Sequence, residues 1–314
     1  MHCLSSTIHV KFSRNDLWII LTDYKKYYIA GNEIGGDYTV PTLLISSIFY
    51  SGHDIVSDSE RGVFDEEKAR KLIGKQLECS ELFNIPTCLD IIAETPEAMS
   101  KYLHFIKKEF FGPIIIDGFV DARIEGLKVA KDLGLMNRVI YNSIWKNQKK
   151  ELEVMKEVGL KTAILFAYDV ANTSAMKRFK VVTEGTSKYD DLFSIAKSVG
   201  INQFLIDNVL TTEFYSLSDA IEANIMFKSI YGYPVGCGPA NINYGLSKSR
   251  LPILDKKMVK MIREASVNTL AQIFSDFILI GPIERIEKAA ISADIVNKII
   301  KHLNFDPFDI LKQG

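Results

Sequence analysis

The sequence alternates eight times between a short apolar run and a longer segment with the apolar spacing of an amphipathic helix. Short runs rich in β-branched residues are typical of buried parallel strands. The runs that we predict as strands are 42–49, 87–94, 113–119, 138–144, 161–169, 201–208, 233–238 and 276–282. The segments that we predict as helices are 65–83, 96–110, 121–134, 147–158, 189–199, 215–231, 255–273 and 284–303.

Consecutive strand–helix units of this number predict an α/β protein with a closed (β/α)8 TIM barrel. An open doubly wound sheet is the alternative, and the absence of a GxGxxG fingerprint weakens it. Residues 17–40 precede the first unit and look like a β-hairpin, with a turn-like Asp23, that could plug the bottom of the barrel. We therefore expect residues 1–314 to form a single domain, with the hairpin as an N-terminal extension and the barrel over residues 41–303.

Composition excludes several classes of protein. The chain is 47% hydrophobic and 25% charged, as a globular protein with a large core is. A net charge of −1 argues against a nucleic-acid-binding surface. Four cysteines without a CxxC pair argue against a bound metal and against a disulfide framework. No apolar run approaches the ~18 residues of a membrane span, and the start lacks the apolar core of a signal peptide. We expect a soluble, cytoplasmic protein without membrane insertion.

Polar residues gather where the predicted strands end, and in a barrel these ends build the active site. The residues in question are Glu94, Asp117, Asn142, Ser143, Asp169, Asp207, Gly238 and Asn241. Any single polar residue of this set could simply cap the helix that follows it. However, Asp117, Asn142 and Asp207 lie directly on apolar strands, and burying them unpaired would cost several kcal/mol. A ligand rich in N–H donors is therefore expected to meet them.

The chemistry of these side chains favours a pterin. A carboxylate accepts two hydrogen bonds side by side, which suits an exocyclic amino group beside a ring N–H, and a carboxamide offers one donor and one acceptor. A sugar phosphate would instead require basic residues or a glycine-rich anion site, and Glu284 lies where phosphate would bind. Cys237 could be a nucleophile, but no His or Lys adjoins it, so a small buried side chain is the better interpretation.

Several blocks of the sequence resemble the H subunit of tetrahydromethanopterin S-methyltransferase. They are IAGNEIGG, PTLLISSIFYSGHDIVSD, IIIDGFVDARIEG, VIYNSI, FLIDN, PVGCGPAN and DFILIGPIE, and the similarity as a whole spans about residues 27–303. The family also includes stand-alone methylcorrinoid:tetrahydrofolate methyltransferases. More distantly, the strand ends resemble the pterin domains of cobalamin-dependent methyltransferases and dihydropteroate synthase.

The resemblance implies methyl transfer, in one-carbon metabolism, between a corrinoid carried by a partner protein and N5 of tetrahydrofolate or tetrahydromethanopterin. It assigns Asp117, Asn142 and Asp207 to the pterin ring, and Asn241 to catalysis near N5. Glu94 matches an acidic strand end of the closer family. A homodimer is also implied by the resemblance alone.

Departures from the family and competing interpretations remain. Asn243 replaces the serine of the strand-seven pattern. Residues 1–20 do not match the usual start of the family, and this difference favours a soluble corrinoid partner over a membrane complex. A non-catalytic docking protein within a larger complex and a dihydropteroate-synthase-like enzyme are the alternatives. The lysine that the synthase places after strand seven has no clear counterpart, since Lys248 lies too far along.

Overall fold

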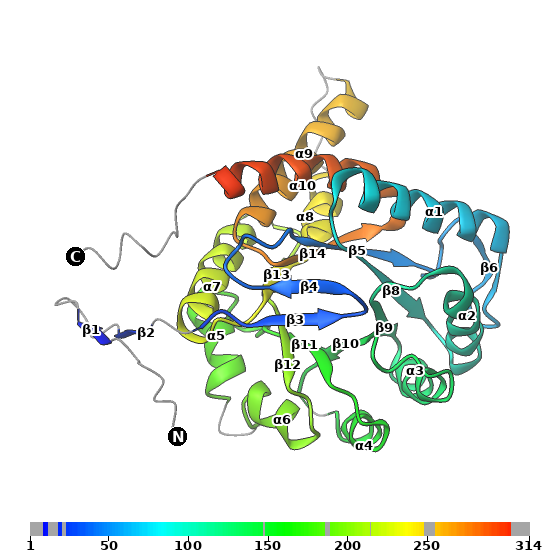
Figure 1. Cartoon of the computed structure of the whole chain (residues 1–314), viewed down its shortest axis with the longest axis horizontal. Helices are drawn as coiled ribbons and strands as arrows, with labels where there is room; N and C mark the ends of the chain where they lie inside the picture. Colours follow the sequence, from blue (N-terminus) through cyan, green and yellow to red (C-terminus); the bar gives the residue numbers. More distant parts are fainter. Residues whose placement is uncertain are drawn as a thin grey trace.

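A computed structural model of the chain contains a closed barrel of eight parallel strands (Figure 1). The structure describes residues 9–11, 18–20, 23–146, 148–185, 189–213, 215–247 and 255–302. The barrel strands are β5 (Leu43–Ile48), β8 (Thr87–Ala93), β9 (Ile114–Gly118), β10 (Val139–Ile144), β11 (Thr162–Phe166), β12 (Gln203–Asp207), β13 (Val235–Cys237) and β14 (Phe277–Pro282). Each pairs with the next along the chain, and β14 pairs with β5 to close the ring. The predicted (β/α)8 barrel is confirmed, and the alternative prediction of an open doubly wound sheet is wrong.

Helices surround this ring, as Figure 1 shows. Those predicted from the sequence are α1 (Glu66–Phe83), α2 (Pro96–Glu109), α3 (Val120–Asp132), α4 (Lys149–Val158), α6 (Leu192–Ser198), α7 (Ser216–Tyr231), α9 (Lys256–Ile273) and α10 (Ile286–His302). Two further helices follow strands where we expected loops: α5 (Ala175–Thr183) and α8 (Pro239–Ser247). A short hairpin of β6 (Val56–Asp58) and β7 (Val63–Phe64) is also inserted before α1, and a 3-10 turn (Ile283–Arg285) precedes α10.

The N-terminal hairpin is present, but its turn differs from the prediction. Strands β3 (Lys26–Ile29) and β4 (Asn32–Gly35) pair across a turn at Ala30 and Gly31, where φ is +47° and +81°. Positive φ at both central residues is the tight-turn geometry that suits a two-residue hairpin. The run before Asp23 contributes β2 (Trp18–Ile20), which pairs instead with β1 (His9–Lys11).

The β3–β4 hairpin closes the end of the barrel at which the strands begin. Its buried Tyr27, Ile29 and Ile34 share one apolar cluster with inward-facing residues of the barrel strands. The Tyr27 hydroxyl also accepts a hydrogen bond from the amide of Phe204 at 3.2 Å. Figure 1 accordingly shows the hairpin lying across the strands, near the centre of the molecule. The expected plug at the bottom of the barrel is therefore found.

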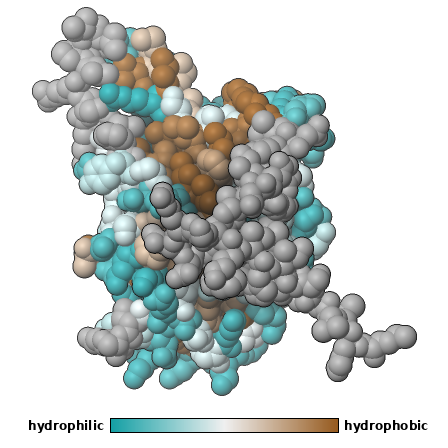
Figure 2. Space-filling view, turned by 90° about the vertical axis from the view of Figure 1, so that its left-hand side faces the viewer, coloured by the Kyte–Doolittle hydropathy of each residue, from teal (hydrophilic) through white to brown (hydrophobic). Residues whose placement is uncertain are grey.

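Apolar side chains also lie on the outside of the molecule. Ile291, Ile295 and Ile299 recur every fourth residue on α10, and each is about half exposed. In Figure 2 apolar surface gathers on the upper part of the face shown, at the height where Figure 1 places α9 and α10. No helix in the described part of the chain is long and apolar enough to cross a membrane.

Candidate active site

A layer of mostly polar side chains lies inside the barrel, above its apolar floor. The floor includes Cys88, Ile115, Ile140, Ile164 and Leu205, one from each of five neighbouring strands. Because side chains alternate along a strand, the residue two positions further on also points inward, closer to the carboxyl end. Those residues, with Ser47 of β5, are Asp90, Asp117, Asn142, Phe166 and Asp207. The layer thus brings together the three polar residues predicted to lie directly on strands.

Asp117 is held at both of its carboxylate oxygens. Oδ1 accepts from the amide of Gly118 at 2.6 Å, and Oδ2 accepts from Nδ2 of Asn142 at 3.0 Å. Burial raises the pKa of Asp117, while the hydrogen bonds and the charge of Arg123 oppose this rise. The predicted pair on strands three and four is therefore in direct contact.

Sequence reasoning missed a second carboxyl group in the same layer. Asp90 lies in the middle of β8 and is 2% exposed. Its Oδ2 accepts from the Ser47 hydroxyl at 2.8 Å, and its Oδ1 has no hydrogen-bond partner among the described residues. Burial, reinforced by the charge of Asp117, raises the pKa of Asp90 well above its ordinary value. The available signal was its position two residues after the inward-facing Cys88.

Asp207 presents an unsatisfied acceptor to the same space. It is 8% exposed, and its Oδ1 has no partner within the described part of the chain. Burial raises the pKa of Asp207 to about 7, against the opposing charge of Arg178. A buried acceptor of this kind is costly unless something donates to it. The site therefore fits a ligand that brings its own N–H groups.

Aromatic rings stand beside the polar layer. Phe166 is the inward-facing residue of β11 and is directly paired in register with Asp207. Its ring meets Trp145 edge-on at 5.9 Å and Tyr168 at 5.8 Å between centroids. This group, also missed from the sequence, offers apolar surface for a flat heterocycle next to hydrogen-bonding groups.

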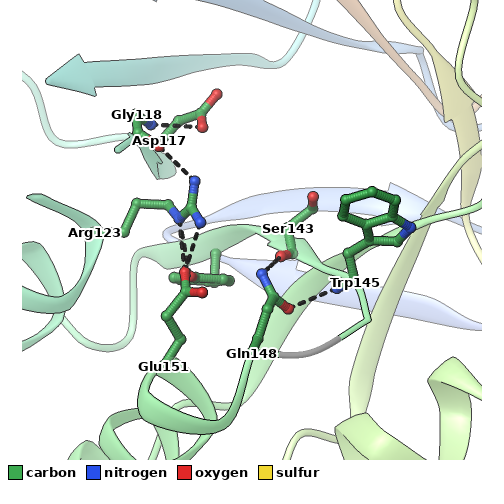
Figure 3. A network of polar contacts seen from close by, with 8 residues as sticks. Asp117, Gly118, Arg123, Ser143, Trp145, Gln148 and Glu151 are labelled. Carbon is green, nitrogen blue, oxygen red and sulfur yellow. Dashed lines mark hydrogen bonds and ion pairs between the residues drawn. The ribbon is translucent and has the colours of Figure 1, made fainter. Parts of the chain in front are cut away.

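A network outside the strands supports these residues (Figure 3). Arg123 donates from Nη1 to the Gly118 carbonyl at 2.5 Å and from Nη2 to Glu151 at 2.6 Å. Gln148 donates to the Ser143 carbonyl at 2.8 Å and accepts from the Trp145 amide at 2.6 Å. The backbone after β9 and around Ser143 is therefore fixed from α3 and from the start of α4.

Two predicted site residues make hydrogen bonds to neighbouring loops. The predicted strand 161–169 is present as β11 but ends at Phe166, three residues before Asp169. Asp169 accepts from the Ala171 amide at 2.9 Å and shapes a turn. Glu94 follows β8 directly, and its Oε2 accepts from the Ser59 hydroxyl at 2.5 Å, which ties the β6–β7 insertion to the barrel. Both contacts are those of structural anchors.

The end of β13 carries the remaining predicted residues. Asn241 lies in the first turn of α8 with an exposed side chain, and its Nδ2 donates to the Leu210 carbonyl at 2.8 Å. Gly238 has almost open space where a Cβ would stand, with one contact to Leu279 at 3.9 Å. Asn243 points to Asn268 of α9, with 3.3 Å between their amides.

Two further predictions concern this end of the barrel. Cys237 is buried, as expected of a small buried side chain, and burial raises the pKa of its thiol to about 12, which disfavours a thiolate. Lys248 lies outside the described residues.

Comparisons with known proteins agree with this geometry. The family model described as tetrahydromethanopterin S-methyltransferase MtrH subunit matches residues 23–307. The H subunit of that enzyme from Methanothermobacter thermautotrophicus is 33% identical over 290 residues, covering 90% of this chain and 94% of the relative. The H subunit of a putative methyltransferase, mtx, from Methanosarcina acetivorans is 30% identical over 295 residues, covering 89% and 93%.

A solved structure shares the fold. Dihydropteroate synthase from Vibrio fischeri aligns with a TM-score of 0.55 at 12% identity, covering 88% of this chain and 98% of the synthase. At that identity the likeness concerns the barrel alone. The sequence matches extend over nearly the whole chain, including every strand of the barrel and its polar layer. The chain therefore belongs to the family of the MtrH subunit of tetrahydromethanopterin S-methyltransferase, whose members are methyltransferase subunits.

Proposed function

We propose that this protein transfers a methyl group between a methylated corrinoid, carried by a partner protein, and N5 of a tetrahydropterin. The observation that carries this proposal is the buried layer of Asp117, Asn142 and Asp207, which holds an unsatisfied acceptor within a barrel of this family. An aminopyrimidinone edge supplies the N–H donors that such acceptors need.

The three residues would bind and orient the ring. The carboxylate of Asp207 would accept from the amino group and the adjacent ring N–H. Asp117 and Asn142, already bonded at 3.0 Å, would add acceptors and one donor from the neighbouring strands. Phe166 would cover one side of the ring. Fixing a reactant in one orientation is itself a large contribution to rate.

Asn241 would act at N5. In the direction of pterin methylation, the N5 lone pair forms the new N–C bond, the cobalt–carbon bond breaks, and its electron pair stays on cobalt. N5 then carries a positive charge until it loses its proton to solvent. The hydrogen bond to Leu210 uses one of the two N–H donors of the Asn241 amide and orients the group, and its oxygen would accept the N5 proton. One such hydrogen bond stabilises developing charge modestly.

The finer assignments are also proposals. The residues of the polar layer would bind the pterin head, which tetrahydrofolate and tetrahydromethanopterin share. We expect a soluble corrinoid protein as partner, because the start of the chain departs from the family, and a cytoplasmic location; the family resemblance adds a homodimer. Sedimentation of the purified protein tests the homodimer, and a monomer at micromolar concentration would refute it.

An anaerobic spectroscopic assay tests the reaction. Purified protein is mixed with methylcob(III)alamin and with tetrahydrofolate or tetrahydromethanopterin, and the cobalamin spectrum is followed. Conversion to the Co(I) form with one pterin supports the proposal and identifies the acceptor. If no conversion occurs, calorimetric titration with each pterin decides, because absence of pterin binding would refute the proposed site.

Two substitutions separate binding from transfer. Asn142→Ala removes the donor bonded to Asp117 and should weaken pterin binding about tenfold, since one hydrogen bond to a charged group is worth about 1.5 kcal/mol or more. Asn241→Ala should mainly slow methyl transfer while leaving pterin affinity within about threefold. Asp294→Asn is the control, because that residue only pairs with Lys298 on the surface of α10. Wild-type kinetics in both test variants would contradict the assignment.

A further inference from the structure

Arg178 is fully buried, and two of its three nitrogen atoms have no hydrogen-bond partner among the described residues. It lies on α5, is 0% exposed, and donates from Nη1 to the Asn208 carbonyl at 3.3 Å. Its Nε and Nη2 have no partner among the described residues. A guanidinium is always charged and carries five N–H donors, so burial with one long bond is costly.

The other buried cations show how unusual this is. Lys228 is equally buried, and its ammonium bonds both oxygens of Asp276 at 2.7 Å. Arg138, which is 7% exposed, donates to two backbone carbonyls near the bottom of the barrel at 3.0 and 2.5 Å. Each of these charges has a partner that accounts for its burial. Arg178 has no carboxylate within ion-pair distance in the described part of the chain, so packing and pairing do not explain its position.

Asp207 explains it. The carbonyl that Arg178 holds belongs to Asn208, the residue that directly follows Asp207 at the end of β12. The guanidinium is also the charged group that opposes the effect of burial on the Asp207 carboxyl. The other titratable groups around the pair are Asp219 on α7, whose charge acts most strongly on Arg178, Cys237 on β13 and Tyr168 after β11; Asp90 and Asp117 lie on β8 and β9, which are not adjacent to β12.

We propose that Arg178 is a positioning residue for Asp207: its guanidinium fixes the end of β12 through Asn208 and keeps the Asp207 carboxylate charged and ready to accept hydrogen bonds from the ligand. Arg178 is completely buried whereas Asp207 is 8% exposed, so the contact with the ligand is assigned to Asp207. Only the identity of that ligand rests on the proposed function; the relation between the two side chains does not.

The test measures Asp207 directly in the free protein. Side-chain carboxyl carbons are labelled with ¹³C in aspartate and titrated by NMR, and the signal lost in Asp207→Asn assigns the residue. Arg178→Gln keeps an N–H donor for the Asn208 carbonyl but removes the charge, so the Asp207 pKa should rise above its value in the unmodified chain. Arg178→Lys keeps the charge and should restore most of the original value.

Matched controls separate this effect from loss of packing. Arg138→Gln removes another buried guanidinium at the opposite end of the barrel and should destabilise the protein without moving the Asp207 pKa. Asp219→Asn removes a carboxylate that competes for Arg178 and should leave the Asp207 pKa unchanged or lower. If Arg178→Gln does not fold, Arg178→Lys and Asp219→Asn still test the proposal, because a higher Asp207 pKa in both would overturn it.

Pterin binding gives a second readout. The pH at which pterin affinity falls by half should move upward by about one pH unit in Arg178→Gln, because a nearby opposite charge shifts a carboxyl pKa by one to three units. Equal Asp207 pKa values in Arg178→Gln and in the unmodified chain would overturn the proposal whatever the ligand. Absence of pterin binding by the unmodified chain would instead refute the proposed function, and the NMR titration would still decide the role of Arg178.

Discussion

Asp207 is a group whose burial works against folding. Its carboxyl has no hydrogen-bond donor at Oδ1 within the described residues, and its pKa rises from 3.8 to about 7. Burial therefore favours the protonated form of this carboxyl, and the free energy of unfolding falls as the pH rises above the pKa that the group has in the unfolded chain. Such a cost is retained where the charge is needed for binding, as the proposed function requires.

Asp207→Asn should therefore stabilise the folded protein at alkaline pH. Because the folded pKa is the higher one, the carboxyl's stabilising contribution is complete below the unfolded pKa and is lost as pH rises to about 7. The substitution should add about 2–4 kcal/mol to the free energy of unfolding at pH 8 and little at pH 4. Urea unfolding of both proteins at several pH values measures this. A pH-independent difference would show that Asp207 titrates normally.

Sequence patterns predicted part of the site at this scale. Asp117, Asn142 and Asp207 were predictable because each interrupts an apolar strand near its carboxyl end, where a barrel builds its site. Asp90 was not, because it lies in mid-strand, where a single polar residue also fits many structural roles. Arg178 was not, because the burial of one helical arginine depends on which helices pack around it.

At the scale of elements, the turn after β9 couples backbone geometry to the site. Gly118 has a φ of +114°, and a Cβ there would lie 1.9 Å from the Ala93 carbonyl oxygen. Its amide donates to Asp117, and its carbonyl accepts from Arg123. Only glycine satisfies this backbone, and the position of Asp117 depends on it.

Gly118→Ala should damage stability and binding together. The strained φ and the steric clash should cost at least about 2 kcal/mol of unfolding free energy. Displacement of the Asp117 carboxylate should weaken pterin binding about tenfold or more. Gly74→Ala on α1 is the control, because a Cβ there meets nothing within 4 Å and should stabilise by about 0.5–1 kcal/mol. Normal pterin affinity in Gly118→Ala would show that the turn does not position Asp117.

The elements that sequence analysis missed are short and weakly marked. α5 ends in Val181, Val182 and Thr183, whose branched side chains lower helix propensity. α8 carries two asparagines and a glycine within nine residues. The eight barrel strands were predictable because apolar residues dominate each of them, as is typical of a buried parallel strand.

At the scale of the whole molecule, the two ends of the barrel carry different kinds of side chain. At one end the β3–β4 hairpin fills the barrel with apolar side chains, and at the other the strands end in the polar layer. The floor between them is a continuous apolar cluster, so stability and binding should be separable.

Ile34→Ala tests that separation. Ile34 is 0% exposed in the hairpin plug, so its truncation should cost about 2–5 kcal/mol of unfolding free energy. Pterin affinity below the unfolding temperature should stay unchanged. Ile291→Ala, at a residue 52% exposed on α10, should change stability by less than about 0.5 kcal/mol. A loss of pterin affinity in Ile34→Ala would show that the plug and the site are coupled.

A barrel plugged at its base has a single entrance. A pterin bound at the polar layer lies deeper than anything that docks at the rim, where α8 and the β6–β7 insertion stand. A corrinoid protein seated on that rim would cover the path by which the pterin enters and leaves. If the proposed function holds, addition should be ordered, with the pterin first on and last off, and excess corrinoid partner should inhibit turnover by trapping the pterin inside.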